Sequence, residues 1–275
     1  MPAGIAMIDW FISAAHAAAA AEGGHHGGDF NPMHQFVINR YFPLYLFGYD
    51  ASFTNSALWM VMATTLVTAL LLYSMRGAAA VPGRLQSISE ITYEFVANMV
   101  RQNAGDAGMK YFPVIFTLFM FVLSMNLLGM IPLPGLGAFT VTSHIIVTFA
   151  LAAFVFIGVT LIGIFKHGFG FLKLFVPSGV PVWLLPLITV IEIISYFTRP
   201  ISLSVRLFAN MMAGHTMLAV FGSFVVGLGI LGGWVPFIFM VLLMGLEVLI
   251  AFLQAYVFAV LSCIYLNDAL HASEH

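Results

Sequence analysis

The sequence contains five long runs of apolar residues that carry few or no charged side chains. An α-helix needs about 20 such residues to cross the hydrocarbon core of a bilayer. The runs are much longer than the roughly 10-residue alternating segments of a transmembrane β-barrel. Only 7% of the residues are charged, whereas soluble domains carry about 25%. The sequence therefore predicts an all-α integral membrane protein.

The last two predicted helices are longer than a bilayer requires. Each exceeds thirty residues, or roughly 50 Å of helix, while the hydrocarbon core is only about 30 Å thick. We therefore expect them to form a long, tilted hairpin, with a kink at Pro200. The five predicted transmembrane helices span about 55–76, 111–131, 141–166, 183–221 and 234–268.

A sixth helix, predicted over 86–103, has a different pattern. Apolar Ile88, Ile91 and Phe95 recur at helical spacing, and Glu90 and Glu94 interrupt them. This amphipathic pattern is typical of a helix that lies in the membrane plane rather than crossing it.

Lysine and arginine residues cluster after the first and third spans. Because such residues favour the cytoplasmic side, we expect the N-terminus outside the cytoplasm and the C-terminus inside it. Residues 1–54 would then form an extracytoplasmic segment and 55–275 the membrane domain. The length and the initial Met1 favour a bacterial plasma (inner) membrane over a mitochondrion.

Several function classes are disfavoured by the composition. The sequence has no basic block, so nucleic-acid binding is not expected. It has no P-loop, so nucleotide chemistry is not expected of this chain by itself. Cys263 is the only cysteine, which leaves no disulfide framework. The Gly- and His-rich stretch 22–34 predicts a solvated linker, with weak metal binding as the alternative. We predict neither a cofactor nor a metal centre.

The two longest predicted helices contain a few polar residues at membrane depth. An arginine or aspartate at the centre of a membrane helix costs about 2.5–3.5 kcal/mol on the insertion scale. Such residues are therefore candidates for function. The candidates are Glu192, Ser202, Arg206, Asn210, His215, Glu247 and Gln254.

The spacing of these residues separates them into groups. Ser202, Arg206 and Asn210 recur every fourth residue and share one helix face. Ala209 and Ala213 lie beside them. Because small residues let another helix approach closely, this face is interpreted as a docking groove for a partner helix.

The expected hairpin also predicts which residues share a depth. His215 and Glu247 are each sixteen residues from Leu231, near the predicted midpoint, so they should face one another. Arg206 falls between this pair and Glu192, which lies toward the cytoplasmic end.

A carboxyl and an imidazole in a partly hydrated pocket can take up and release protons. Arginine cannot do so, because its guanidinium group stays protonated in proteins. Two proton-accessible regions separated by a fixed cation indicate a proton path that is interrupted at Arg206. An acidic residue on a partner helix would have to carry the proton past it.

Three stretches carry a family resemblance: "RPISLSVRLFANMMAGH", "EVLIAFLQAYVFAVLSCIYL" and "MNLLGMIP". Together they resemble subunit a of the F-type ATP synthase. The resemblance implies a proton-translocating stator subunit that is not an enzyme by itself. Its implied partners are the c-subunit ring, whose helices carry membrane carboxylates, b-type peripheral stalk subunits, lipid and protons.

The resemblance also implies roles for individual residues. Arg206 matches the essential arginine, which causes each arriving carboxyl group to release its proton and blocks leakage between the half-channels. Glu192 and Ser202 would belong to the cytoplasmic half-channel. His215 and Glu247 are exchanged relative to some bacterial members, and because the hairpin pairs these positions, the exchange should preserve function. The outer half-channel would contain Asn210, His215, Glu247, Gln254, Asn126 and Asp50.

Two other functions remain open at the level of sequence. A secondary transporter could use Arg206 to hold an anionic substrate, although such proteins usually contain internal repeats. An intramembrane metalloenzyme could use His144, His215 and Glu247, although the H-E-x-x-H spacing is missing. Substrate uptake by the isolated chain would indicate the first, and a bound metal the second.

Overall fold

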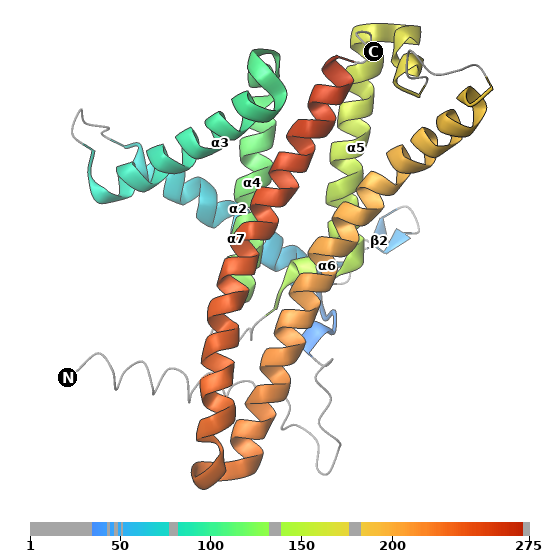
Figure 1. Cartoon of the computed structure of the whole chain (residues 1–275). Coiled ribbons are helices and arrows are strands. Elements are labelled where there is room, and N and C mark those ends of the chain that lie inside the picture. Colours follow the sequence, from blue (N-terminus) through green and yellow to red (C-terminus); the bar gives the residue numbers. More distant parts are fainter. Residues whose placement is uncertain are drawn as a thin grey trace. The chain divides into compact units, whose positions relative to one another are not determined.

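The computed structural model describes residues 35–42, 45–46, 49–50, 52–76, 82–131, 139–175 and 183–271. The stretch 22–34 lies outside these residues. Most of the described chain is helical, in line with the predicted fold class (Figure 1). The main helices are α2 (Asn55–Ser74), α3 (Arg84–Gly108), α4 (Phe112–Gly129), α5 (Ile145–His167), α6 (Leu185–Gly232) and α7 (Trp234–Leu270).

Helix α3 occupies the segment predicted as the in-plane helix. Its regular part ends at Gly105, which has φ 65° and ψ −171°. This left-handed φ is favourable for glycine because it has no Cβ. A short 3₁₀ turn, η2 (Met109–Tyr111), then leads into α4. The break at Gly105 separates the amphipathic helix from the apolar helix that follows.

Helix α6 is longer than the sequence indicated. The predicted helix over 183–221 is observed from Leu185 to Gly232, and its backbone stays helical through Pro200. The predicted end at residue 221 was too early, because a helical glycine costs only about 1 kcal/mol relative to alanine, and the helix continues into the stretch "GLGILGG" before it breaks there. Of the residues in α6, Gly229 has non-helical angles, with φ 60°. Helix α7 begins two residues after α6 ends.

Short strands precede α2 and were not predicted. Strands β1 (Arg40–Phe42) and β4 (Phe53–Thr54) pair antiparallel, as do β2 (Tyr45–Leu46) and β3 (Tyr49–Asp50). Segments of two or three residues are too short to give a recognisable alternating pattern, which explains why the sequence did not reveal them.

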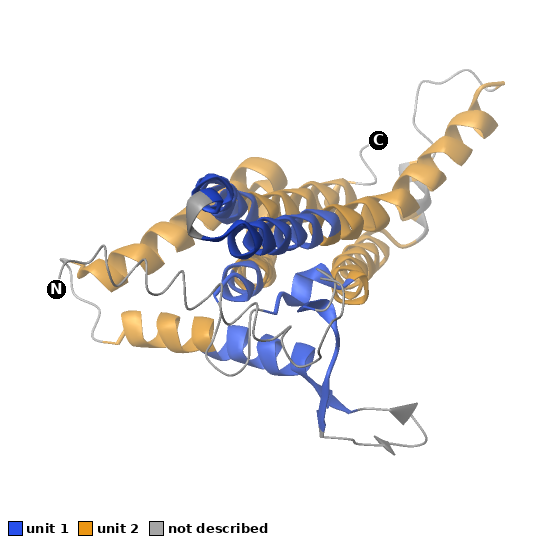
Figure 2. Cartoon of the chain, turned by 90° about the horizontal axis from the view of Figure 1, so that it is seen from below, with its two compact units in different colours: residues 1–65, 124–144, 209–252 blue, residues 66–123, 145–208, 253–275 orange. Residues whose placement is uncertain are grey.

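The chain divides into two compact units, which are coloured separately in Figure 2. Unit 1 comprises residues 1–65, 124–144 and 209–252, and unit 2 comprises 66–123, 145–208 and 253–275. In unit 1, α6 and α7 lie side by side, and the rings of Phe221 and Phe239 stack with centroids 6.0 Å apart. In unit 2, α5 meets α6 where the Thr160 hydroxyl lies 2.6 Å from that of Tyr196.

Candidate functional site

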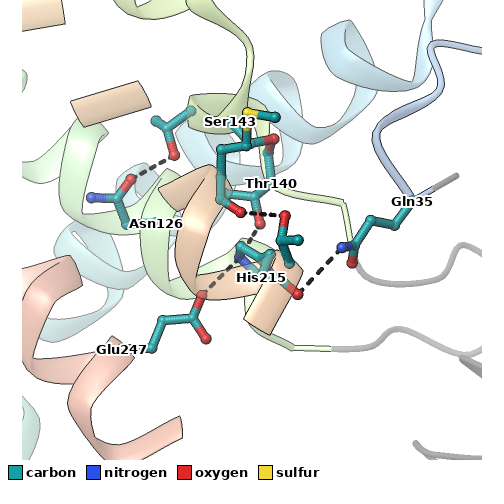
Figure 3. Close-up of polar contacts among 9 residues, drawn as sticks. Gln35, Asn126, Thr140, Ser143, His215 and Glu247 are labelled. Carbon is teal, nitrogen blue, oxygen red and sulfur yellow. Dashed lines mark hydrogen bonds and ion pairs between the residues drawn. The ribbon is translucent and has the colours of Figure 1, made fainter. Parts of the chain in front are cut away.

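His215 on α6 and Glu247 on α7 meet in the interior of unit 1 (Figure 3). The distance between His215 Nε2 and Glu247 Oε1 is 3.4 Å, and the two side chains are 7% and 3% exposed. The pairing that the hairpin predicted is therefore confirmed. Both groups can bind and release a proton, and both are shielded from bulk water.

His215 has two further contacts in unit 1. Its Nε2 is hydrogen-bonded to the Oγ1 of Thr140, a buried residue just before the 3₁₀ turn η3 (Val141–Ser143). Its backbone carbonyl accepts a hydrogen bond of 3.3 Å from Gln35 Nε2 (Figure 3). Neither Thr140 nor Gln35 was among the residues predicted from the sequence. These contacts fix both the ring and the backbone of His215.

The carboxyl group of Glu247 is buried without a full set of partners. Among the residues that the structure describes, neither of its oxygens has a hydrogen-bond partner, and the imidazole at 3.4 Å is its polar neighbour. A buried carboxylate without hydrogen bonds is costly. This arrangement favours the sharing of one proton between the carboxyl and the imidazole over a permanent charge on Glu247.

Gly214 provides the space that this carboxyl occupies. A Cβ atom added at Gly214 would lie 2.7 Å from Glu247 Oε1 and 3.1 Å from its Cδ. Since carbon and oxygen do not approach this closely without a bond, any larger residue at position 214 must displace the carboxyl group.

Under the proton-translocating function that the family resemblance implies, Gly214→Ala is expected to reduce proton flux roughly threefold to tenfold, because displaced reacting groups transfer protons poorly. The helix itself should gain up to about 1 kcal/mol from the alanine. Proton pumping per assembled complex is the measurement. Gly222→Ala is the matched control, since its added Cβ would meet Met240 Sδ at an ordinary 3.9 Å. Equal flux in both variants would contradict the importance of this space.

Asn126 lies in the same unit and is fully buried. Its Nδ2 donates to the carbonyl of Ala251 at 3.2 Å, and its Oδ1 accepts from Thr142 Oγ1 at 2.7 Å. It thus ties α4 to α7 and to η3. Asp50 was predicted for the same path; its backbone belongs to β3, and its side chain lies outside the described part of the chain.

The other predicted residues differ in exposure. Asn210 in unit 1 is half-buried, and Gln254 in unit 2 is 6% exposed. Ser202 and Arg206 of α6 are exposed, and Glu192 is half-buried. Among the described residues, no hydrogen bond or ion pair joins Glu192, Ser202 and Arg206 to one another or to Gln254. The structure therefore does not assemble them into a second cluster.

Unit 2 contains an ion pair that the sequence reasoning missed. Arg199 Nη1 lies 2.9 Å from Asp268 Oδ2, and the guanidinium carbon is 5.1 Å from the centroid of the Tyr265 ring. Lys166 Nζ and His167 Nε2 each lie 2.9 Å from the carbonyl oxygen of Leu270. The sequence feature that could have indicated the Arg199–Asp268 ion pair was the presence of opposite charges near the same end of the predicted hairpin. These contacts join the end of α5 and the region of α6 around Arg199 to the end of α7.

No group of three or more His, Cys, Asp or Glu residues in the described ranges is arranged to hold a metal ion. In the same ranges, five helical segments are long and apolar enough to cross a membrane. They are Asn55–Ser74, Arg84–Gly129, Ile145–His167, Leu185–Gly229 and Trp234–Leu270. The fold and the site therefore define a multi-pass helical membrane protein with a buried imidazole–carboxyl pair.

The family model of the ATP synthase A chain matches residues 57–267. ATP synthase subunit a of Pelagibacter ubique (strain HTCC1062) is 59% identical over 242 residues, which cover 88% of this chain and 98% of that protein. ATP synthase subunit a of Maricaulis maris (strain MCS10) is 55% identical over 253 residues, covering 88% and 98%. That of Rhizobium meliloti (strain 1021) is 57% identical over 251 residues, covering 89% and 99%.

The chain belongs to the ATP synthase A chain family. The resemblance found in the sequence is thereby confirmed.

Proposed function

We propose that the chain is the proton-translocating membrane subunit of a rotary ATP synthase. Its family membership supports this function, and one observation carries the mechanism. Arg206 is exposed in the chain by itself, on an apolar helix, with no carboxylate paired to it in the described residues. A cation at membrane depth is costly without a partner, so the partner is a carboxylate on another subunit.

The outer half-channel contains the His215–Glu247 pair. The pair is buried, its two reacting atoms are 3.4 Å apart, and the carboxyl oxygens are free to accept a proton. A proton from the extracytoplasmic side binds this pair and passes to the arriving carboxylate of a c subunit. Asn210, Gln254, Asn126 and Asp50 belong to the same path.

The cytoplasmic half-channel contains Glu192 and Ser202. The proton leaves a c-subunit carboxyl when Arg206 attracts the resulting carboxylate, and it exits past Glu192. Because arginine does not release its own proton, no proton passes directly between the half-channels. Rotation of the c ring is then the route that connects them.

The face of α6 that carries Arg206 suits a close partner helix. Exposed Ser202, Ala209 and Ala213 lie at helical spacing from Arg206 and have small side chains. Small residues allow two helix backbones to approach closely. We assign this face to the c ring. The peripheral stalk of b-type subunits and the surrounding lipid cover other surfaces.

Helix α3 lies in the plane of the membrane on the cytoplasmic side in this proposal. Exposed Ile88 and Ile91 enter the apolar layer, while Glu94 and Arg101, also exposed, face the aqueous phase. The N-terminal segment 1–54 is extracytoplasmic, the C-terminus is cytoplasmic, and the membrane is the bacterial inner membrane.

Cysteine cross-linking tests the assignment of the α6 face. The one native cysteine, Cys263, is buried and should not react. Ala213→Cys is expected to cross-link in the assembled complex to a cysteine placed one helical turn from the c-subunit carboxylate. Ala150→Cys, which is exposed on α5, is the matched control and should not cross-link. Cross-linking of position 150 but not of position 213 would contradict the proposal.

A further inference from the structure

The segment from Phe139 to His144 brings an unassigned hydroxyl group to the buried pair (Figure 3). Thr140 is 2% exposed, and its Oγ1 is hydrogen-bonded to Nε2 of His215. The same nitrogen is 3.4 Å from Glu247 Oε1. The imidazole nitrogen that faces the carboxyl group therefore also faces the threonine hydroxyl.

We propose that Thr140 is a positioning residue for proton transfer between His215 and Glu247. The inference rests on the proposed function of this pair as part of the outer half-channel. Thr140 holds Nε2 at the carboxyl oxygen and can form a hydrogen bond to it both before and after each change of protonation.

The chemistry of a hydroxyl group suits this role. A hydroxyl both donates and accepts hydrogen bonds. When Nε2 is unprotonated, the Thr140 hydroxyl donates its hydrogen to the nitrogen lone pair, and this bond opens by rotation of the hydroxyl as the carboxyl proton moves onto Nε2. When Nε2 carries a hydrogen, the Thr140 oxygen accepts it, in a hydrogen bond shared with the Glu247 carboxyl oxygen. The ring therefore has this partner both before and after it gains or loses a proton. A carbonyl or an ammonium group would suit only one of the two states.

The backbone around Thr140 is fixed by its neighbours in unit 1. A Cβ added at Gly129 would lie 2.5 Å from Thr140 Oγ1 and 2.9 Å from its Cα, so Thr140 packs directly against this glycine. Ser143 Oγ donates to the carbonyl of Thr140 at 2.5 Å. His144 Nε2 lies 3.0 Å from the carbonyl oxygen of Phe36. Since the segment is fixed in this way, the hydroxyl determines where the ring lies.

The test replaces Thr140 in the complete ATP synthase and measures ATP-driven proton pumping per assembled complex. Thr140→Val keeps the shape and removes the hydroxyl. We expect it to lower proton flux roughly fivefold to tenfold, the order of one lost hydrogen bond between neutral groups. Thr140→Ser keeps the hydroxyl and should restore most of the flux. Thr140→Ala replaces the valine variant if the latter does not assemble.

Two controls make the result specific. Thr148→Val removes another buried threonine hydroxyl, one that donates to Ile145 at 3.1 Å, and should leave the flux unchanged. Glu247→Gln tests the proposed function itself. Normal flux in Glu247→Gln would overturn the proton path. Slow flux in Glu247→Gln with normal flux in Thr140→Val would overturn only the role of Thr140, as would a serine variant as slow as the valine variant.

Discussion

Replacing Arg206 by glutamine is expected to abolish ATP synthesis driven by a proton gradient. Glutamine keeps a polar side chain of moderate length but removes the fixed positive charge. In the proposed mechanism this charge promotes release of the proton from each c-subunit carboxyl group and keeps the half-channels apart. Without it, rotation and proton flow are no longer linked. The measurement is ATP synthesis in membrane vesicles under an imposed proton gradient, normalised to the assembled complex.

Because Arg206 is exposed, this test can separate a loss of function from a loss of folding. The side chain has no ion-pair partner in the described part of the chain, so its loss should not unfold the subunit. Arg101→Gln, which removes an exposed arginine from α3, is the matched control and should retain synthesis. Passive proton flux is a second readout: it should persist in Arg206→Gln, because the half-channels themselves are intact. Coupled synthesis in Arg206→Gln would refute the assigned role.

Glu247→Gln is expected to slow proton flux about 100-fold, at the lower end of the range for loss of a positioned acid–base group. Glutamine occupies nearly the same volume beside Gly214 but cannot exchange a proton with His215. The environment of the carboxyl supports this size of effect, because it is 3% exposed and His215 is its ion-pair partner in the described residues. The measurement is ATP-driven proton pumping, with Glu94→Gln, an exposed residue of α3, as the control.

Exchanging the two residues sharpens the same prediction. His215→Glu combined with Glu247→His retains one carboxyl and one imidazole at facing positions of the hairpin. We expect the double variant to pump faster than either single replacement. A double variant as slow as the single variants would mean that the pair depends on its individual positions, and the neighbouring Thr140 hydroxyl would be the first reason to examine.

The sequence revealed the part of the candidate site that lies on regular helices. Each residue of an α-helix advances by the same distance along the axis, so residues equally far from the turn of a hairpin lie at the same depth. Counting residues from Leu231 was therefore enough to pair His215 with Glu247. The count worked because α6 and α7 are joined by a short turn. The same count did not pair Arg199 with Asp268, because these two residues are separated from Leu231 by different numbers of residues.

The residues that only the tertiary structure placed lie in irregular segments. Thr140 and Gln35 reach His215 from parts of the chain that are 75 and 180 residues away in sequence. No periodicity describes the path of such segments, because their backbone is fixed by individual hydrogen bonds and by close contacts such as that between Gly129 and Thr140. The short strands before α2 escaped prediction for the same reason.

The sequence by itself therefore determined a helical membrane protein, the family to which it is similar, and the pairing of an imidazole with a carboxyl group. These follow from hydrophobic length and helical spacing, which are properties of single segments. The tertiary structure decided which groups surround that pair, namely the Thr140 hydroxyl and the space at Gly214. Such contacts depend on where separate segments of the chain meet. They are stabilised by close packing between those segments rather than by any local sequence pattern.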